Sequence, residues 1–242
     1  MSEPFSAVTA AILAGGLGTR LRSVVTDRPK VLAPVGGRPF VTHLLDRLAA
    51  AGVRETVLLV GFGAGHVRSA LGNDYAGMRL THSAETGPLG TGGALRLALP
   101  AIPCETVLLL NGDSYCDVDL KSFYTSTNVR PGAVGMVLAD VPDAARYGRV
   151  EVTPSGDVVQ FLEKTGDPAP GRINAGIYLI PRACVAAIPP GRAVSLERDL
   201  MPGWVGTVGV RAFGGGRFID IGTPESYADA EHFFRGDGPH VG

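Results

Sequence analysis

The pattern of hydrophobic and polar positions along the first half of the chain alternates between strand-like and helix-like segments. Short apolar runs predict strands that are buried on both faces of a sheet, and they cover residues 8–14, 56–60 and 106–110. The more polar stretch 78–83 is expected to form a further strand. Between these strands, apolar residues recur at helical spacing, and we expect helices over residues 40–48, 67–71 and 92–99. Strands that alternate with helices predict parallel βαβ units in a doubly wound sheet, which binds ligands beyond the carboxyl ends of its strands.

The pattern changes after about Pro131, where strands outnumber helices. Strands are expected over residues 133–139, 149–152, 158–162, 172–180, 207–213 and 218–221. Ser155 and Gly156 form a turn that joins the second and third of these as a hairpin. Helices are expected over 196–201, capped by Ser195, and over 224–234. We therefore expect a single α/β domain with a Rossmann-like, mixed but mostly parallel sheet, comprising a first part over about 7–130, a second over about 131–235 and a tail at 236–242.

Composition limits the partners of the chain. Its 242 residues include 22 Lys and Arg against 23 Asp and Glu, which leaves a formal net charge of −1. Nucleic-acid and membrane surfaces both select a basic excess, so we expect neither partner, and a few well-placed cations must hold any anionic ligand. No apolar run reaches the ~18 residues of a membrane-spanning helix.

Two features predict a cytoplasmic location. The N-terminal residues 1–6 lack the basic start of a signal peptide, and the apolar run that follows leads into glycines instead of a cleavage site. Cys104, Cys116 and Cys184 are an odd number without metal-binding spacing, which is typical of reduced thiols. The sequence leaves open whether the chain forms a homo-oligomer.

The first apolar run leads directly into Leu13–Leu21, which reads LAGGLGTRL. Bare glycines after a strand let a phosphate approach backbone N–H groups that point at it. The loop lacks the Gly-Lys-Ser/Thr of a Walker motif, and Leu21 stands where the dinucleotide fingerprint needs its third glycine, which disfavours a dehydrogenase. A turn needed only for packing is the alternative. Arg20 and Lys30 favour a ligand, because two cations beside bare amides suit a triphosphate.

Six motifs, in this order, resemble those of the sugar-1-phosphate nucleotidyltransferases, also called nucleotide-sugar pyrophosphorylases. They are Gly15–Leu21 with Pro29 and Lys30, Pro88–Thr91, Asn111–Asp113, Glu163–Lys164, Asn174–Gly176 and Phe218–Pro224. The resemblance implies a fold of the nucleotide-diphospho-sugar transferase type. It also implies that a nucleoside monophosphate passes from a nucleoside triphosphate to a sugar 1-phosphate, with release of pyrophosphate and with Mg²⁺ as cofactor.

The resemblance implies a role for each matching residue. Arg20, Lys30 and Lys164 would be the catalytic cations, and Asp113 and Asp220 the metal ligands. The nucleotide site would comprise Leu13, Ala14, Gly15, Gly16, Gly18, Thr19, Glu85, Gly90 and Thr91. The sugar site would comprise Asn111, Gly112, Gly148, Glu163 and Asn174. A strand-end cap is the alternative for either aspartate.

We assign no catalytic or binding role to the other polar residues considered. We assign Asp117 to a loop and Asp119 to a helix cap. None of the five histidines is expected to act as a general base, because a sugar phosphate is already ionised near pH 7 and needs none.

Glu85 favours guanine as the base, because one carboxylate can accept both adjacent N–H donors of that base; a solvent-facing glutamate is the alternative. The motifs at Arg146–Val150, Ser195–Glu197 and Phe218–Tyr227 most resemble the D-glycero-α-D-manno-heptose 1-phosphate guanylyltransferases. Ala175 is a departure, since those enzymes have Asn-Gly-Gly where this chain has Asn-Ala-Gly. Mannose or glucose 1-phosphate as acceptor, UTP as donor, and a catalytically silent nucleotide-sugar sensor therefore stay open.

Overall fold

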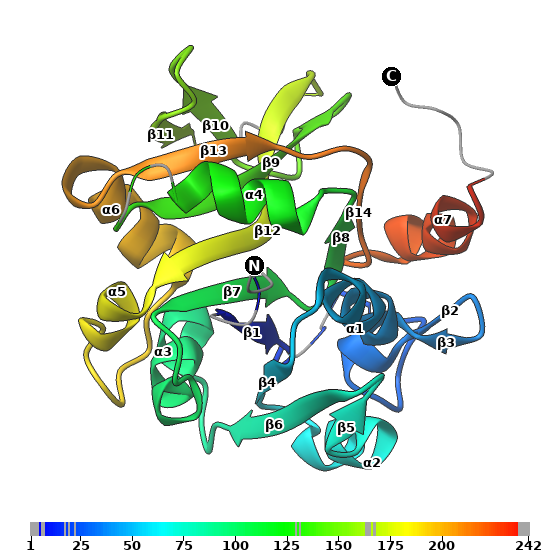
Figure 1. Ribbon diagram of the computed structural model, residues 1–242. Helices are drawn as coiled ribbons and strands as arrows, with labels where there is room; N and C mark the ends of the chain where they lie inside the picture. Colours follow the sequence, from blue (N-terminus) through cyan, green and yellow to red (C-terminus); the bar gives the residue numbers. More distant parts are fainter. Residues whose placement is uncertain are drawn as a thin grey trace.

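A mixed sheet forms the centre of the computed structural model, which describes residues 5, 8–16, 18, 20, 21, 23–128, 130, 132–162, 166 and 168–236. Within this part of the chain the sheet has ten strands in the order β11-β10-β12-β7-β1-β4-β6-β5, with β9 and β13 off this path (Figure 1). They are β1 (Val8–Leu13), β4 (Glu55–Val60), β5 (Asp74–Tyr75), β6 (Met78–Ala84), β7 (Thr106–Asn111), β9 (Val134–Val141), β10 (Arg149–Val152), β11 (Val158–Leu162), β12 (Gly171–Pro181) and β13 (Val210–Gly214).

The first part of the sheet is parallel except for its short edge strand β5, and the second part is mainly antiparallel. Strand β1 lies between β4 and β7 and runs parallel to both, and β4 runs parallel to β6. Strand β12 runs antiparallel to β7 and β9. Two short pairs lie outside this sheet, β8 (Ser114–Cys116) with β14 (Phe218–Asp220) and β2 (Pro34–Val35) with β3 (Arg38–Pro39). The expected mixed, doubly wound sheet is confirmed.

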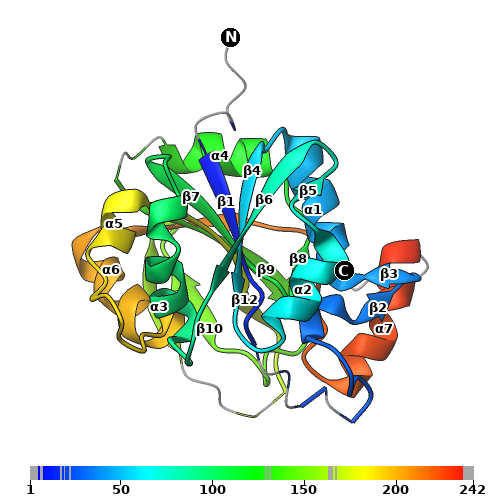
Figure 2. The same ribbon diagram turned by 90° about the horizontal axis from the view of Figure 1, so that it is seen from below.

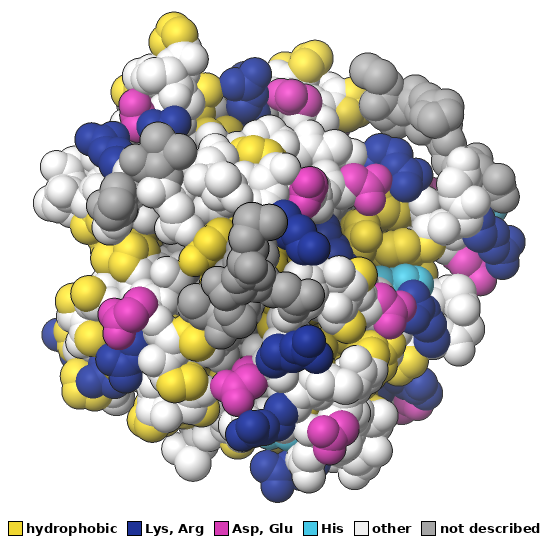
Figure 3. Space-filling view, in the orientation of Figure 1, with side chains coloured by type: hydrophobic (Ala, Val, Ile, Leu, Met, Phe, Trp, Pro, Cys, Tyr) yellow, Lys and Arg dark blue, Asp and Glu magenta, His cyan; other side chains and the backbone are white. Residues whose placement is uncertain are grey.

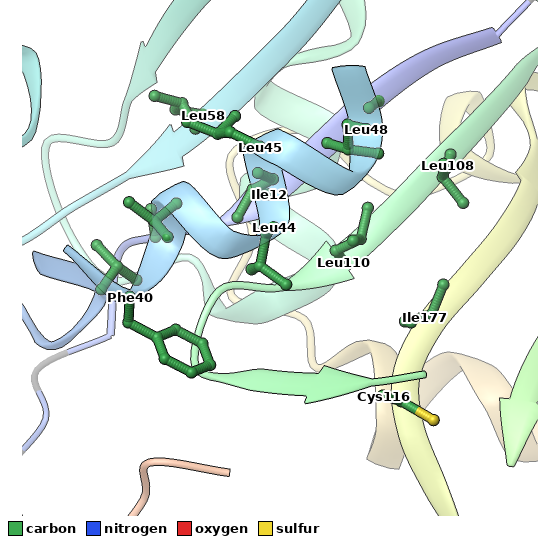
Figure 4. Packing of buried hydrophobic residues seen from close by; sticks show 14 of the residues in the cluster. Ile12, Phe40, Leu44, Leu45, Leu48, Leu58, Leu108, Leu110, Cys116 and Ile177 are labelled. Carbon is green, nitrogen blue, oxygen red and sulfur yellow. The ribbon is translucent and has the colours of Figure 1, made fainter. Parts of the chain in front are cut away.

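Alternate residues of the central strands enter two separate cores, because successive side chains of a strand point to opposite faces. Ile12 and Leu58 face α1, with Leu44 of that helix beside Ile12 and Leu45 beside Leu58 (Figure 4). Their neighbours Ala11 and Val57 belong to the opposite core with α3, α5 and α6. Figure 2 shows these three helices on one side of the sheet and α1, α2 and α7 on the other. The helices are α1 (Phe40–Ala51), α2 (Ala64–Leu71), α3 (Gly90–Leu97), α4 (Leu120–Asn128), α5 (Arg182–Ala186), α6 (Met201–Thr207) and α7 (Pro224–Arg235).

The largest difference from the expected elements of the second half lies between residues 196 and 210. The helix expected over 196–201 is one π turn, Leu196–Leu200, which leads into α6 and continues to Thr207. The strand expected from residue 207 begins only at Val210, so that start was wrong. Trp204 of α6 is buried in the same core as α3 and α5, so residues expected to begin a strand instead end a helix that packs on the sheet.

The strands β2, β3, β5 and β8 and the helix α5 were not expected from the sequence. Helix α4 was expected only through its cap, Asp119. Helix α4 reads LKSFYTSTN, which is rich in Ser and Thr. These side chains compete for backbone hydrogen bonds and weaken a helical pattern. Asp119 does cap α4, as expected, and accepts hydrogen bonds from the backbone N–H groups of Lys121 and Ser122.

The surface carries charges of both signs. Figure 3 shows Lys and Arg side chains interspersed with Asp and Glu over the described part of one face. Among the described residues, no helix has the length and apolar content needed to cross a bilayer. All three cysteines belong to the described part and are free thiols.

A close backbone approach joins the ends of β1 and β7. The N–H of Gly112 donates a hydrogen bond to the carbonyl of Leu13 at 3.0 Å. A Cβ on Gly112 would overlap that carbonyl oxygen and lie 2.9 Å from Val31 Cγ1. A residue without a side chain is therefore required at position 112. The contact fixes the ends of β1 and β7, and hence the start of the loop that follows each strand.

Replacement of Gly112 by alanine is expected to lower the free energy of unfolding by about 1–3 kcal/mol, because overpacking at a buried contact forces backbone shifts. Urea denaturation measures the change. The matched control is Gly206→Ala in α6, where a Cβ would meet nothing within 4 Å; its stability should be unchanged or higher, since alanine is the better helix former. Equal stability of the two variants would contradict the packing role of Gly112.

Candidate active site

Four parallel strands end at one edge of the sheet, and the loops that follow them lie next to one another. Leu13 is in register with Leu59 on one side and with Asn111 on the other, and Val60 is in register with Ala84. Parallel sheets bind ligands at this edge. The loops that meet there carry the glycines, Glu85 and Asp113.

The glycine loop has one packed side and one open side. A Cβ on Gly15 would lie 3.0 Å from the backbone nitrogen of Gly61, and a Cβ on Gly18, at φ +56°, would lie 3.2 Å from Lys30 Cβ. At Gly16, which is exposed, a Cβ would meet nothing within 4 Å. Packing thus explains why Gly15 and Gly18 have no side chain, but it does not explain the glycine at position 16. An open, bare stretch of backbone is what close approach by a phosphate requires.

Glu85 is held beside this loop and does not face solvent freely. Its Oε2 accepts a hydrogen bond from Leu89 N at 3.0 Å. Its Oε1 lies 2.6 Å from the place of a Gly61 Cβ and 3.4 Å from that of a Gly15 Cβ. The carboxylate therefore lies over the loop that would receive the nucleotide, while its contact with a base stays a prediction.

Gly90 and Thr91 contact a distant segment of the chain. Gly90 has φ +69°, and a Cβ there would lie 2.6 Å from the carbonyl oxygen of Val194. The Thr91 hydroxyl donates to Glu197 Oε2 at 2.9 Å and accepts from Leu196 N at 2.7 Å. These two residues hold the start of α3 against the second half of the chain, a role that the sequence did not predict. Their contact with a nucleotide stays a prediction.

Lys30 and Asp113 form an ion pair at the end of β7. Lys30 lies in a 3₁₀ turn, Lys30–Leu32, and its Nζ lies 2.8 Å from Asp113 Oδ2. The lysine side chain is 12% exposed and the aspartate 44%. A pocket of about 470 Å³ adjoins the pair and is lined by Gly18, Leu21, Val25, Thr26, Arg28, Lys30 and Phe62. Lys30 therefore connects the glycine loop, the pocket and Asp113.

Asp220 reaches Asp113 through backbone pairing. Strand β14 pairs antiparallel with β8, which places Asp220 opposite Ser114, and Ile221 N donates to the Asp113 carbonyl at 2.9 Å. Beyond Asp220, α7 begins with a capping box between Thr223 and Ser226. The structure thus brings the two aspartates together from distant parts of the sequence.

Three groups surround the Asp220 carboxylate. Arg146 Nη2 lies 3.1 Å from Oδ1 and 3.2 Å from Oδ2, the Tyr147 hydroxyl donates to Oδ2, and Gly222 N donates to Oδ1 at 2.6 Å. Burial, together with the bond to Asp220, raises the pKa of Tyr147 well above its usual value, so its hydroxyl stays protonated. The sequence analysis used Arg146 and Tyr147 only as part of a motif and missed them as site residues.

The predicted sugar-binding asparagines lie on neighbouring strands. Asn174 Nδ2 donates to the Tyr178 hydroxyl at 2.7 Å, and its Oδ1 accepts from Gly176 N at 2.9 Å. Gly176 has φ +75°, and a Cβ there would lie 2.5 Å from Asn111 Nδ2. Asn111 Oδ1 is buried without a hydrogen-bond partner. A ligand hydroxyl could satisfy this oxygen, which leaves the sugar-binding prediction for Asn111 open.

Of the remaining predicted site residues, some belong to the described part of the chain and others do not. Arg20 is exposed in a turn after the glycine loop, and a Cβ on Gly148 would lie 2.9 Å from the Leu162 carbonyl oxygen. Thr19, Glu163 and Lys164 lie outside the described residues. Their roles stay predictions from the family resemblance.

The donor set fits a divalent cation that is shared with a phosphate. Within the described ranges, no group of three or more His, Cys, Asp or Glu could hold a metal alone. Mg²⁺ in nucleotide-transfer sites is bound by one or two carboxylates together with substrate phosphates. Asp113 and Asp220 match that pattern. His43 does not contribute, because it stacks on Phe234 with ring centroids 3.9 Å apart.

Comparison with known proteins identifies the class. The chain matches the nucleotidyl transferase family model over residues 9–236 and belongs to that family. It is 33% identical to D-glycero-alpha-D-manno-heptose 1-phosphate guanylyltransferases of Campylobacter jejuni and Aneurinibacillus thermoaerophilus, over 90% and 92% of this chain and 96% of each relative. It is 35% identical to the mannose-1-phosphate guanylyltransferase of Mycobacterium tuberculosis, but spans only 62% of that protein.

Solved structures agree with this family membership. HddC from Yersinia pseudotuberculosis complexed with GMP-PN matches with a TM-score of 0.82 at 33% identity, covering 93% of this chain and 99% of that one. A putative glucose-1-phosphate thymidylyltransferase from Bacillus anthracis matches with a TM-score of 0.84 at 23% identity, which supports the fold alone.

Thr91→Val is expected to lower the free energy of unfolding by about 1–3 kcal/mol, because it leaves Leu196 N and the Glu197 carboxylate without the hydroxyl. Thr91→Ser keeps that hydroxyl and is the matched control. Guanidinium denaturation of both variants compares them. If the Thr91→Val and Thr91→Ser variants proved equally stable, the hydrogen bonds of Thr91 with Leu196 and Glu197 would not contribute to folding stability.

Proposed function

We propose that this chain is a sugar-1-phosphate nucleotidyltransferase that transfers GMP from GTP to a sugar 1-phosphate, with D-glycero-α-D-manno-heptose 1-phosphate as acceptor. One observation carries the proposal: open glycine backbone, the Lys30–Asp113 ion pair and Asp220 meet at one edge of the sheet. A site for two polyanions needs this combination of bare amides, fixed cations and carboxylates that hold a metal. The near-complete coverage of the heptose enzymes supports the choice of acceptor.

The proposed reaction is an in-line displacement at phosphorus. A phosphate oxygen of the sugar forms a bond to the α-phosphorus of GTP, and the bond to the bridging oxygen breaks, so that its electron pair leaves with pyrophosphate. Lys30, fixed beneath the glycine loop, would stabilise charge on the leaving phosphates. Asp113 and Asp220 would hold Mg²⁺, which when bound neutralises and orients phosphate oxygens.

A catalytically silent sensor is the alternative from another class. A sensor has to bind a nucleotide sugar but not to stabilise a leaving group. Lys30, paired with Asp113 beside the glycine loop, favours an enzyme, because a cation fixed at this place can stabilise the charge of a leaving phosphate, which a sensor does not need.

A panel of four nucleoside triphosphates against heptose, mannose and glucose 1-phosphates tests the proposal, with pyrophosphate release as the measurement. GTP with the heptose phosphate should give the highest kcat/KM, by about tenfold or more over UTP. The highest value with mannose 1-phosphate would favour the activity named for the mycobacterial relative. Turnover with no pair would favour the sensor.

Glu85→Gln tests the base preference. Gln keeps an oxygen that can accept from Leu89 N, so the loop is preserved, but it cannot accept both N–H donors of guanine. We expect kcat/KM for GTP to fall by roughly 10–100-fold, with UTP much less affected. Glu105→Gln, at an exposed position, is the control. An unchanged ratio of GTP to UTP would remove Glu85 from base recognition.

A further inference from the structure

Each candidate metal ligand already has a cationic partner in this structure. Lys30 Nζ lies 2.8 Å from Asp113, and Arg146 Nη2 lies within 3.2 Å of both oxygens of Asp220. These four side chains have opposite charges in equal number. A divalent cation that joined them unchanged would face two positive groups at close range, which is unfavourable in a partly buried site.

The carboxylate of Asp220 has no unused oxygen. Its Oδ1 accepts from Gly222 N and Arg146, and its Oδ2 accepts from the Tyr147 hydroxyl and Arg146. A metal ion can therefore bind Asp220 only if one of these donors leaves. Gly222 N belongs to the backbone of the same turn, and Tyr147 is half-buried, so Arg146 is the group that can move.

The two cations differ in their freedom to move. The Lys30 side chain is 12% exposed, and its Cβ packs beside Gly18. The Arg146 side chain is 44% exposed, and apart from Asp220 it contacts the face of the Tyr147 ring, with Cζ 5.5 Å from the ring centroid. A half-exposed guanidinium can reorient without disturbing the core. Lys30 stays in place, while Arg146 can leave.

The position of Arg146 in the fold indicates where it would go. Arg146 and Tyr147 precede β10, whose Arg149 is in register with Ile173 of β12. Asn174, a predicted sugar contact, follows directly on that strand. Arg146 thus lies on the acceptor side of the aspartates, whereas Lys30 lies beside the glycine loop on the nucleotide side. Of the two proposed substrates, the sugar 1-phosphate is therefore the one whose phosphate we expect nearest to Arg146.

We propose that Arg146 is an exchangeable counter-ion: it neutralises Asp220 in the metal-free enzyme and moves to the phosphate of the sugar 1-phosphate when a divalent cation takes its place. Tyr147 and Gly222 N keep the carboxylate oriented throughout the exchange. Arg146 then acts as a positioning residue for the acceptor. This inference rests on the proposed function for the identity of the phosphate, but the exchange at Asp220 is independent of turnover.

The exchange is tested by titrating the nucleotide-free protein with Mn²⁺ and measuring free Mn²⁺ by electron paramagnetic resonance. Arg146→Gln should bind Mn²⁺ about fivefold more tightly than the original chain, since a partly exposed ion pair no longer competes. Arg146→Lys keeps the charge and should lie between them. Arg172→Gln removes an equal charge from an exposed pair with Asp140 and should leave the affinity unchanged. Asp220→Asn should weaken binding in every background.

Several outcomes would overturn the exchange. Unchanged or weaker Mn²⁺ binding by Arg146→Gln would do so, as would a gain of equal size in Arg172→Gln. Absence of binding in both the original chain and Arg146→Gln would also overturn it, whereas binding only in Arg146→Gln would support it.

Kinetics test the second half of the inference. Arg146→Gln should raise KM for the sugar 1-phosphate about tenfold, consistent with loss of one charge-assisted contact, and leave KM for GTP unchanged. A rise for GTP alone, or no change in either KM, would overturn the assignment to the acceptor. If no substrate pair turns over, the proposed function fails, yet the Mn²⁺ titration still decides whether Arg146 competes with metal.

Discussion

The backbone hydrogen bond between Gly112 and Leu13 is the contact on which the arrangement of the site depends. It fastens the end of β7, which leads to Asp113, to the end of β1, which leads into the glycine loop. The pairing of β8 with β14 then carries Asp220 to the same place. Because the main chain makes these connections, strand register places the two aspartates next to each other.

The two candidate metal ligands and their two cationic partners balance in charge. Lys30 and Arg146 each face one of the two aspartates. A nucleoside triphosphate and a sugar phosphate together bring several negative charges, so the site must become more positive before both can be held. In the exchange proposed above, a divalent metal would arrive at Asp220 while Arg146 moves from that carboxylate to the acceptor phosphate, which would supply the added positive charge without any movement of the sheet.

Sequence reasoning predicted the parts of the molecule that depend on local pattern. The unbroken run at 106–110 predicted a strand with two buried faces, and its polar end predicted where Asp113 would lie. It failed where partners are distant in the chain. The contacts of Gly90 with Val194 and of Asp220 with Arg146 depend on how separate segments meet. Residue spacing and hydrophobic periodicity do not predict contacts between distant segments. A matched motif likewise does not show which of its side chains faces the site.

Contacts between the first and second halves of the chain limit which segments could be exchanged with those of a relative. Strand β12 completes the sheet beside β7, and the carbonyl of Val194 accepts hydrogen bonds from the first-turn amides of Gly92 and Gly93. Removal of the second half would therefore take the backbone cap from the start of α3 and leave β7 without its neighbour β12. A chimaera that exchanges second halves between relatives has to keep a segment that can pair with the α3 terminus in the way Val194 does.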